Sequence, residues 1–520
     1  MGEDIDQGRR RFLGLATGAA VGGALGAAAA QPAATAVALS ETLAMSGGEL
    51  SQAIHARRIS CVEVLREYLK HIERCNPKVN ALVALEDPDE LLGQALERDT
   101  QLARGQTLGV LHGIPHAVKD LQPVAGLRFT QGSPLFKDFV AQNDSLMVAR
   151  LRAAGAIFIG KTNTPEFGLG SHTYNAVYGI TRNAYDPARS AGGSSGGAAV
   201  ALALRMLPFA DGSDYGGSLR NPAGWNNVVG FRTSIGRTPN DARDVWLPSM
   251  RVVGPMARSV TDAALLLSVQ AGYDARAPLS IEGEGTAFRR VPEGALKGRR
   301  IAFGADLSGH APCEPGVLEV CRAALRTFSA LGCHVEEAHP DYDLEAVWQA
   351  LIKLRGWQTG SNLLGYYNDP AKRAQLKPEA LYEIETGLKL SAYDISAASV
   401  VRSEWYEATR RFFERYDFLI LPTAQMFPFP AEEHWPQRLA GRQMRTYHEW
   451  MKGTLLITMT GSPSLAVPAG FSREGLPMGL QIIAANRREL DCLALGHAYE
   501  EASDWVRLRP PPLVKLPVST

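Results

Sequence analysis

The stretch over residues 192–220 limits what this chain can be more than any other part of its sequence. It opens with GGSSGG, continues as an apolar, helix-like run over residues 198–207, and closes with SDYGGSLR. Glycines beside a serine let the backbone turn tightly and present its N–H groups without a Cβ in the way. The pattern therefore presents two serines, Ser194 and Ser218, 24 positions apart and each in tight backbone.

A lysine in apolar surroundings precedes this stretch. Lys119 lies 75 positions before Ser194. A lysine acts as a base only when it is neutral, so its reference pKa near 10.4 must fall by roughly three units, about 4 kcal/mol. Burial has this effect, because desolvation disfavours the ammonium form. The neighbouring side chains are apolar enough for such burial: Leu111, Ile114, Ala117 and Val118.

The hexamer GGSSGG by itself has other interpretations. Most Gly/Ser-rich hexamers are flexible loops, and a phosphate-binding loop is disfavoured because no Gly-Lys-Ser/Thr follows. The spacing Gly192-x-Ser194-x-Gly196 also fits the nucleophile elbow of α/β-hydrolases. That elbow needs a strand directly before it, whereas residues 183–189 are typical of a polar turn. Only the combination of the hexamer with Ser218 and Lys119 favours catalysis.

This combination resembles the amidase signature family, whose members hydrolyse amides with a Ser/cis-Ser/Lys triad, and the resemblance covers roughly residues 45–510. It implies that Ser218 is the nucleophile, that Ser194 is a bridging serine in a cis peptide, and that neutral Lys119 is the base. An amide carbonyl is a poor electrophile, so the serine must lose its proton as it attacks, and the oxyanion needs donors already aimed at it. No metal or organic cofactor is implied.

The resemblance implies further roles around the triad. The oxyanion hole would be formed by Tyr215, Gly216, Gly217 and Ser218, and the substrate would contact Gly168, Leu169, Gly170 and Ser194. Supporting roles would fall to Ser195, Ser213, Asp214 and Arg220. Two large residues, Tyr215 and Trp225, stand where the family has smaller ones, so we expect them to reshape the pocket. Aryl amides, peptide amides, cyclic amides, carbamates and esters therefore all remain open as substrates.

Helical patterns alternate with short apolar strands along most of the chain. Ser60 and Glu63 form a capping box before an amphipathic helix that we expect to end at Asn76-Pro77. Residues 108–119 and 156–160 are typical of strands, residues 144–154 of a helix, and residues 341–415 of several helices. This alternation predicts an α/β protein. With the resemblance it predicts an α/β/α architecture, a mixed twisted sheet covered by helices on both faces, in a single amidase domain over residues 40–515.

The first 36 residues are typical of a twin-arginine export signal. Adjacent arginines, then Phe12-Leu13, precede an uncharged Gly/Ala-rich stretch over residues 15–30 and A-x-A cleavage sites. The alternative is a membrane anchor, but about sixteen weakly apolar residues are too few to span a bilayer. We therefore expect an exported, periplasmic or secreted protein without stable membrane insertion, whose signal is cleaved at a position that stays open.

The composition limits the classes of binding partner that we expect. Lysine plus arginine and aspartate plus glutamate are equal at 54 each, so the charge gives no reason to expect nucleic acid as a partner. The six cysteines are scattered and form no C-x-x-C motif, which disfavours a zinc site. Their disulfide pairing stays open. We expect a small amide substrate, and a homodimer is compatible with the family.

The sequence as a whole predicts an exported amidohydrolase that cleaves a carboxamide C–N bond through an acyl-enzyme on Ser218. Esterase or carbamate hydrolase activity is an alternative within the family. A transamidating component of a tRNA-dependent amidotransferase is another, although export argues against it. An alternative that is not an enzyme is an inactive periplasmic ligand-binding protein on an amidase fold, although an intact triad argues against it.

Overall fold

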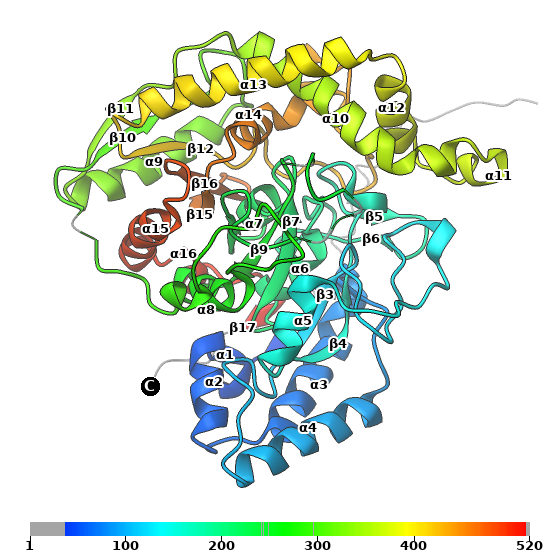
Figure 1. Cartoon of the computed structure of the whole chain (residues 1–520). Helices are drawn as coiled ribbons and strands as arrows, with labels where there is room; N and C mark the ends of the chain where they lie inside the picture. Colours follow the sequence, from blue (N-terminus) through cyan, green and yellow to red (C-terminus); the bar gives the residue numbers. More distant parts are fainter. Residues whose placement is uncertain (1–36, 241, 243, 248, 295, 516–520) are drawn as a thin grey trace, which may run out of the picture. The chain divides into compact units, whose positions relative to one another are not determined.

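A mixed eight-stranded sheet runs through the middle of the fold (Figure 1). This computed structural model describes residues 37–515 except positions 241, 243, 248 and 295, so the predicted export signal lies outside the described residues. The strands lie in the order β11 (His334–Glu337), β10 (Arg300–Phe303), β12 (Phe418–Pro422), β16 (Pro477–Ile483), β15 (Ser464–Phe471), β8 (Val229–Arg232), β9 (Val252–Ala257) and β7 (Ala210–Asp214). The strands β11, β10 and β12 are parallel and the remaining pairs are antiparallel.

Helices flank this sheet, as the sequence predicts. Helices α8 (Val260–Gln270), α9 (Val317–Ala330) and α15 (Glu489–Ser503) pack against it as one group. The short helices α6 (Gly196–Ala203) and α7 (Arg220–Trp225) form a second group that packs against strands of the same sheet. Every residue of α6 is buried, because its small and apolar side chains allow close packing on all sides. The predicted α/β fold class is confirmed.

The N-terminal part of the described chain builds a second, three-stranded sheet. Its order is β2 (Leu82–Val83), β4 (Ile157–Thr162), β3 (Pro115–Lys119), with β3 and β4 parallel. The strand that we expected over residues 108–119 is shorter, because Gly109 and Gly113 turn the preceding backbone with positive φ values of 148° and 75°. Helices α3 (Cys61–Val79), α4 (Pro88–Ala103) and α5 (Leu146–Ala153) belong to the same part of the chain (Figure 1).

Helix α3 begins at the predicted capping box but ends later than predicted. Ser60 and Glu63 bond each other's backbone N–H as expected. The helix continues through Pro77 to Val79 and stops at Asn80, which is left-handed. Val79 is fully buried, so its packing favours the extra turn despite the hydrogen bond that proline cannot donate.

A layer of helices, two of them long, lies along the top of Figure 1. It comprises α10 (Leu344–Tyr367), α11 (Pro370–Arg373), α12 (Pro378–Gly387) and α13 (Ala392–Phe412), with α14 (Lys452–Thr460) packed beneath. The helical prediction for residues 341–415 is confirmed. The remaining short elements are β1 (Val37–Ala38), α1 (Glu41–Ala44), α2 (Gly47–His55), β5 (Tyr174–Asn175), β6 (Gly179–Ile180), β13 (Arg438–Leu439), β14 (Arg442–Gln443), α16 (Trp505–Leu508), β17 (Val514–Lys515) and four 3₁₀ turns at 134–136, 166–168, 285–288 and 449–451.

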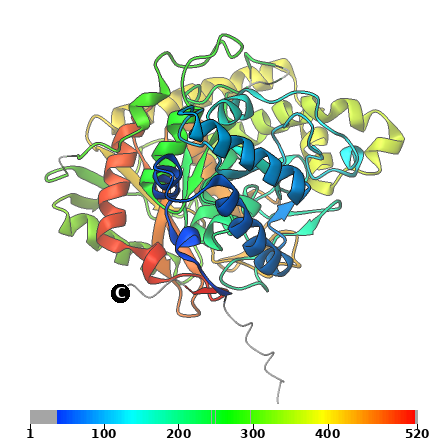
Figure 2. The same ribbon diagram turned by 90° about the horizontal axis from the view of Figure 1, so that it is seen from below.

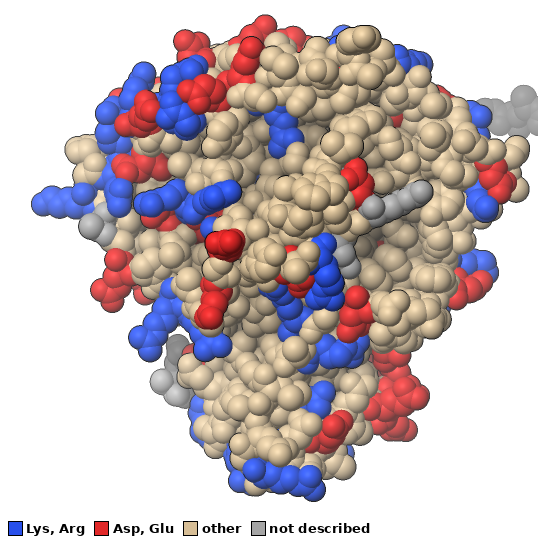
Figure 3. Space-filling model, viewed as in Figure 1, with Lys and Arg blue, Asp and Glu red and all other residues tan. Residues whose placement is uncertain are grey.

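The two ends of the described chain meet. Strand β1 pairs in parallel with β17, and Figure 2 shows blue N-terminal segments near red C-terminal ones. All six cysteine thiols are free. No helix within residues 37–515, as far as these are described, is long and apolar enough to cross a membrane. On the face in Figure 3, acidic and basic side chains are interspersed, in keeping with the balanced composition.

Candidate active site

Lys119 is at the centre of the candidate site. It ends strand β3, and its side chain is fully buried. Its Nζ lies 2.8 Å from Ser194 Oγ, 2.8 Å from Ser195 Oγ and 3.1 Å from Ser213 Oγ. The fold therefore brings the predicted base together with the predicted bridging serine and with both predicted supporting serines.

The surroundings of Lys119 favour the neutral amine. Burial lowers the pKa of Lys119 well below its usual range, and the positive charge of Arg251 lowers it further, while Asp211 and Asp214 oppose the shift. Desolvation disfavours the ammonium form because the three serine hydroxyls cannot replace its hydration. An unprotonated lysine 2.8 Å from a serine hydroxyl can accept that serine's proton.

Asp211 holds the backbone beneath Lys119. It lies on strand β7, accepts the backbone N–H of Lys119 at 3.2 Å, and lies 3.0 Å from Nε2 of His116. Neither residue was identified from the sequence. A signal existed for Asp211, because residues two apart on a strand share a face, and Ser213 is two positions further along.

Ser194 lies in tightly packed backbone ahead of helix α6. The Gly193–Ser194 peptide bond is cis, which is the conformation that the family resemblance implies. A Cβ on Gly197 would lie 2.4 Å from the backbone nitrogen of Asn163, so the glycine is needed for this approach. A Cβ on Gly168 would lie 3.5 Å from Ser194 Oγ, which places the predicted substrate-binding turn beside the bridging serine.

Ser218 borders the same cavity as Ser194 and Ser213. It sits between β7 and α7, is 6% exposed, and its carbonyl accepts the N–H of Ser195 at 3.3 Å. Among the described residues no hydrogen bond joins the hydroxyls of Ser218 and Ser194. The structure thus brings the predicted nucleophile and the predicted bridging serine to one cavity. Lys119 and Ser194 are hydrogen-bonded, whereas the described residues show no hydrogen bond between the hydroxyls of Ser194 and Ser218.

The four residues predicted for the oxyanion hole have different roles in this geometry. The N–H of Gly217 donates to Asp214 Oδ1 at 2.9 Å, so Gly217 is not free to donate to an oxyanion, contrary to our expectation. Its φ of 122° and its tight approach to Thr454 instead make it a turn residue. The backbone N–H groups of Tyr215, Gly216 and Ser218 have no protein partner within the described part of the chain.

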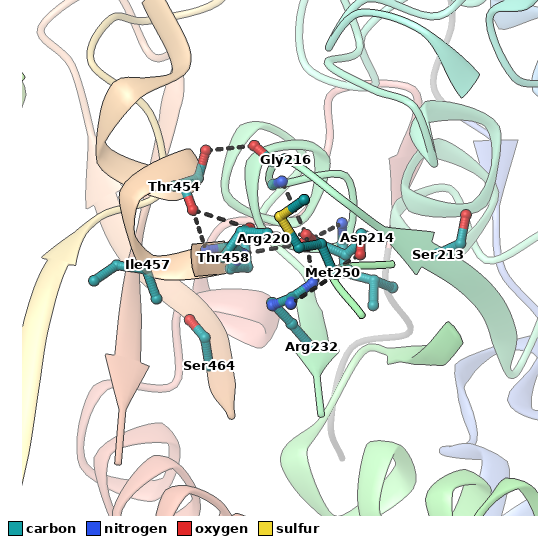
Figure 4. A network of polar contacts seen from close by, with 12 residues as sticks. Ser213, Asp214, Gly216, Arg220, Arg232, Met250, Thr454, Ile457, Thr458 and Ser464 are labelled. Atoms are coloured by element: carbon teal, nitrogen blue, oxygen red, sulfur yellow. Dashed lines mark hydrogen bonds and ion pairs between the residues drawn. The ribbon is translucent and has the colours of Figure 1, made fainter. Parts of the chain in front are cut away.

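Asp214 and Arg220 hold this turn as the sequence predicts, and Figure 4 shows the network. Nε and Nη2, on one edge of the Arg220 guanidinium, donate to the two oxygens of the Asp214 carboxylate at 3.0 and 2.9 Å. Burial alone would raise the pKa of Asp214, but the charges of Arg220 and Arg232 hold it well below its usual range. Arg220 also donates to the backbone oxygen of Thr454, to Thr458 and to Gln481, each at 2.9 Å. None of these partners was identified from the sequence.

The cavity in front of Ser218 has a volume of about 350 Å³. Much of its lining is apolar, and includes Leu121, Phe167, Leu169, Ile235, Val252 and Leu279. Tyr215 borders it, as expected. The same expectation for Trp225 is wrong, because its indole is fully buried, donates to the Met426 carbonyl at 3.0 Å and stacks on Trp450.

The predicted substrate-binding turn is held by a lysine on the opposite helical layer. Gly168 and Leu169 line the cavity, whereas Gly170 does not. Lys377, directly before α12, donates from Nζ to the Leu169 carbonyl at 3.0 Å, and its backbone N–H donates to Glu166 at 2.8 Å. Lys377 has no local sequence signal, since it lies more than 200 positions from both partners.

Lys377→Met is expected to raise KM for an amide substrate by about threefold to tenfold with a smaller effect on kcat, because the hydrogen bond that fixes the turn is lost together with a nearly buried ion pair to Glu379. Steady-state kinetics on a chromogenic anilide would measure the change. Lys372→Met removes a similar charge from an exposed ion pair with Asp369 and serves as the matched control. Equal KM values for the two variants would contradict the prediction.

Comparisons with known proteins identify the family of this chain. A sequence model described as Amidase matches residues 63–493. An acylamidase of Rhodococcus erythropolis is 34% identical over 470 residues, which are 90% of this chain and 97% of that protein. A glutamyl-tRNA(Gln) amidotransferase component from Thermosynechococcus vestitus is 33% identical, over 89% of this chain and 98% of that protein.

Solved structures resemble the fold over nearly its whole length. A bacterial aryl acylamidase of the amidase signature enzymes superposes with a TM-score of 0.85 at 29% identity, covering 92% of this chain and 100% of that one. A 6-aminohexanoate cyclic dimer hydrolase, solved with its substrate, gives a TM-score of 0.79 at 26% identity over 91% of this chain and 99% of that one.

Proposed function

Because the chain belongs to the amidase signature family and acts on amide C–N bonds, we propose that it does so through an acyl-enzyme on Ser218. The observation that carries the proposal is the 2.8 Å separation of Lys119 Nζ and Ser194 Oγ in a fully buried site. Burial also lowers the pKa of this lysine, which favours the neutral amine that can accept a proton.

The reaction follows from this arrangement. Ser218 Oγ attacks the substrate carbonyl carbon as its proton passes to Ser194 and the Ser194 proton passes to Lys119. The developing oxyanion accepts hydrogen bonds from the backbone of the 215–218 turn. The N–H groups of Tyr215, Gly216 and Ser218 are the donors. The relay then returns a proton to the leaving nitrogen, and the C–N bond breaks. Water attacks the acyl-enzyme by the same relay, which releases the acid and restores Ser218.

The substrate that fits best is a small amide with an apolar or aromatic group. Aromatic and aliphatic side chains such as Phe167, Leu121 and Leu363 line the cavity, and burial of apolar substrate atoms there is favourable. The names of two relatives, an acylamidase and an aryl acylamidase, point to the same class. We therefore propose N-acyl aryl amides as first substrates.

The test is covalent labelling combined with turnover. Purified protein lacking residues 1–36 would be treated with a fluorophosphonate, which captures an activated serine, and the adduct located by peptide mass mapping. In parallel, hydrolysis of p-nitroacetanilide would be followed by release of p-nitroaniline. An adduct on Ser218 together with turnover is the expected result. An adduct confined to Ser194 would contradict the Ser218 assignment. The absence of both labelling and turnover would favour a ligand-binding protein.

We also propose that residues 1–36 direct export to the periplasm or beyond by the twin-arginine route. Fractionation of bacteria that express the full chain is expected to recover a shortened protein outside the cytoplasm. Replacing Arg9 and Arg10 together by lysine should retain the full-length chain in the cytoplasm, because that route reads the arginine pair. Unchanged export of the double variant would contradict the route.

A further inference from the structure

Helix α10 presents a polar stripe to the cavity. Arg355, Gln358, Thr359 and Asn362 all line it, and their spacing of three and four places them on one helical face. Four hydrogen-bonding side chains of the lining therefore come from one face of one helix. Such convergent polar groups in a mainly apolar pocket fix the orientation of a ligand.

Arg355 is the most firmly held member of this stripe. It is 5% exposed, its Nε donates to Glu383 at 2.6 Å, and its Nη2 donates to the Tyr447 hydroxyl at 3.1 Å. Burial alone would raise the pKa of Glu383, but Arg355 and His448 lower it to about 2. The Arg355–Glu383 pair is therefore ionised, and its two charges compensate each other.

One end of the Arg355 guanidinium remains available. The hydrogen bonds of this side chain within the described residues use Nε and Nη2, and none uses Nη1. The guanidinium carbon lies 4.7 Å from the centre of the Tyr215 ring, and the Tyr215 hydroxyl donates to Gln358 at 3.2 Å. Because Arg355 lines the cavity, its Nη1 can donate to a ligand atom that accepts a hydrogen bond there.

We propose that Arg355 is a substrate-binding residue whose Nη1 donates to a second carbonyl oxygen of the substrate, separate from the scissile carbonyl. This inference rests on the proposed function of the Ser218 site. The ligand is a neutral acceptor and not a carboxylate, because Glu383 already compensates the charge of Arg355. Among the described residues of the lining, the two other charged side chains, Arg251 and Asp244, are also opposite in sign. The preferred substrates are therefore small compounds with two carbonyl groups, such as N-acylamino amides.

Matched substrates test this recognition. On the acyl side, N-acetylglycine p-nitroanilide is compared with pentanoic p-nitroanilide, which has the same chain length but lacks the second carbonyl, and with succinic acid mono-p-nitroanilide, which carries a carboxylate. On the amine side, 4-acetamidoacetanilide is compared with 4-propylacetanilide. In one of the two series, the second carbonyl is expected to raise kcat/KM by about 10-fold to 100-fold. No preference in either series, or a preference for the carboxylate, would overturn the proposal.

Variants assign the preference to Arg355. In Arg355→Lys, and in the double variant Arg355→Met/Glu383→Gln, the ratio of kcat/KM within the preferred series is expected to fall to about threefold or less. The double variant removes both charges, so it leaves no unpaired buried ion that would prevent folding. Lys353→Met removes a partly exposed cation of the same helix, paired with Asp394, and should keep the wild-type ratio.

Fluorophosphonate labelling of each variant separates this inference from the proposed function. If Ser218 is labelled and p-nitroacetanilide is hydrolysed, but the Arg355 variants lower both members of a pair by the same factor, Arg355 is only structural and the inference fails alone. If the wild-type protein is neither labelled nor active, the proposed function fails and the inference fails with it.

Discussion

Ser218→Ala is expected to lower kcat for amide hydrolysis by about four orders of magnitude or more, because no other group can form the acyl-enzyme. It should also abolish fluorophosphonate labelling. Release of p-nitroaniline from p-nitroacetanilide measures the first effect, and intact-protein mass measures the second. Ser399→Ala, on the exposed surface of α13, is the matched control and should retain both properties.

The outcome that would contradict this prediction is specific. If Ser218→Ala kept kcat within tenfold of wild type while its thermal unfolding was unchanged, Ser218 would not be the nucleophile. Labelling of the variant at Ser194 would point to the nucleophile elbow interpretation, in which the hexamer GGSSGG carries the reactive serine.

Lys119→Met is expected to lower kcat/KM at pH 7 by about three to four orders of magnitude, because the relay loses its base. In the wild-type protein, kcat/KM should rise with pH through the lowered pKa of Lys119 and then level off, since only the neutral amine accepts a proton. The variant should lose this rise. A pH–rate profile from weakly acidic to alkaline pH measures both effects, and an unchanged profile in Lys119→Met would contradict the assignment.

The same substitution should stabilise the fold. Below its ordinary pKa of 10.5 the unfolded chain binds a proton at Lys119, whereas the folded chain does not until the pH falls below the lowered value. The free energy of unfolding of the wild type therefore increases with pH across that window. Lys119→Met removes the cost of deprotonation, so its unfolding free energy at pH 7 should exceed that of the wild type in urea titrations. A less stable variant would contradict this prediction and would mean that the hydrogen bonds of Lys119 Nζ to three serines outweigh that cost.

Local sequence was sufficient where local interactions decide the structure. The capping box of Ser60 and Glu63 predicted the start of α3, because both partners lie within one helical turn. The apolar neighbours of Lys119 predicted its burial. The cis peptide before Ser194 came from the family resemblance alone, since nothing in the composition of GGSSGG requires it.

Residues from distant parts of the chain were not predictable in the same way. Lys377 holds the Leu169 carbonyl across 208 positions, and Arg355 meets the Tyr215 ring across 140 positions. Periodicity predicts which face of a helix is buried, but not which other segment it meets. Trp225 illustrates the limit, because a short buried helix gives no local indication of whether an indole faces a ligand cavity or another tryptophan.

The anchoring of Arg220 has a consequence for when the chain becomes an enzyme. Lys119, Ser194 and Ser218 all lie in the first half of the sequence, but three of the residues that fix Arg220, Thr454, Thr458 and Gln481, belong to α14 and β16, which are made near the end. Until those elements have folded, the turn that carries Ser218 lacks its supports. An unfinished chain would therefore hold every reacting residue without the geometry to use them, and activity would begin only when synthesis and folding are complete.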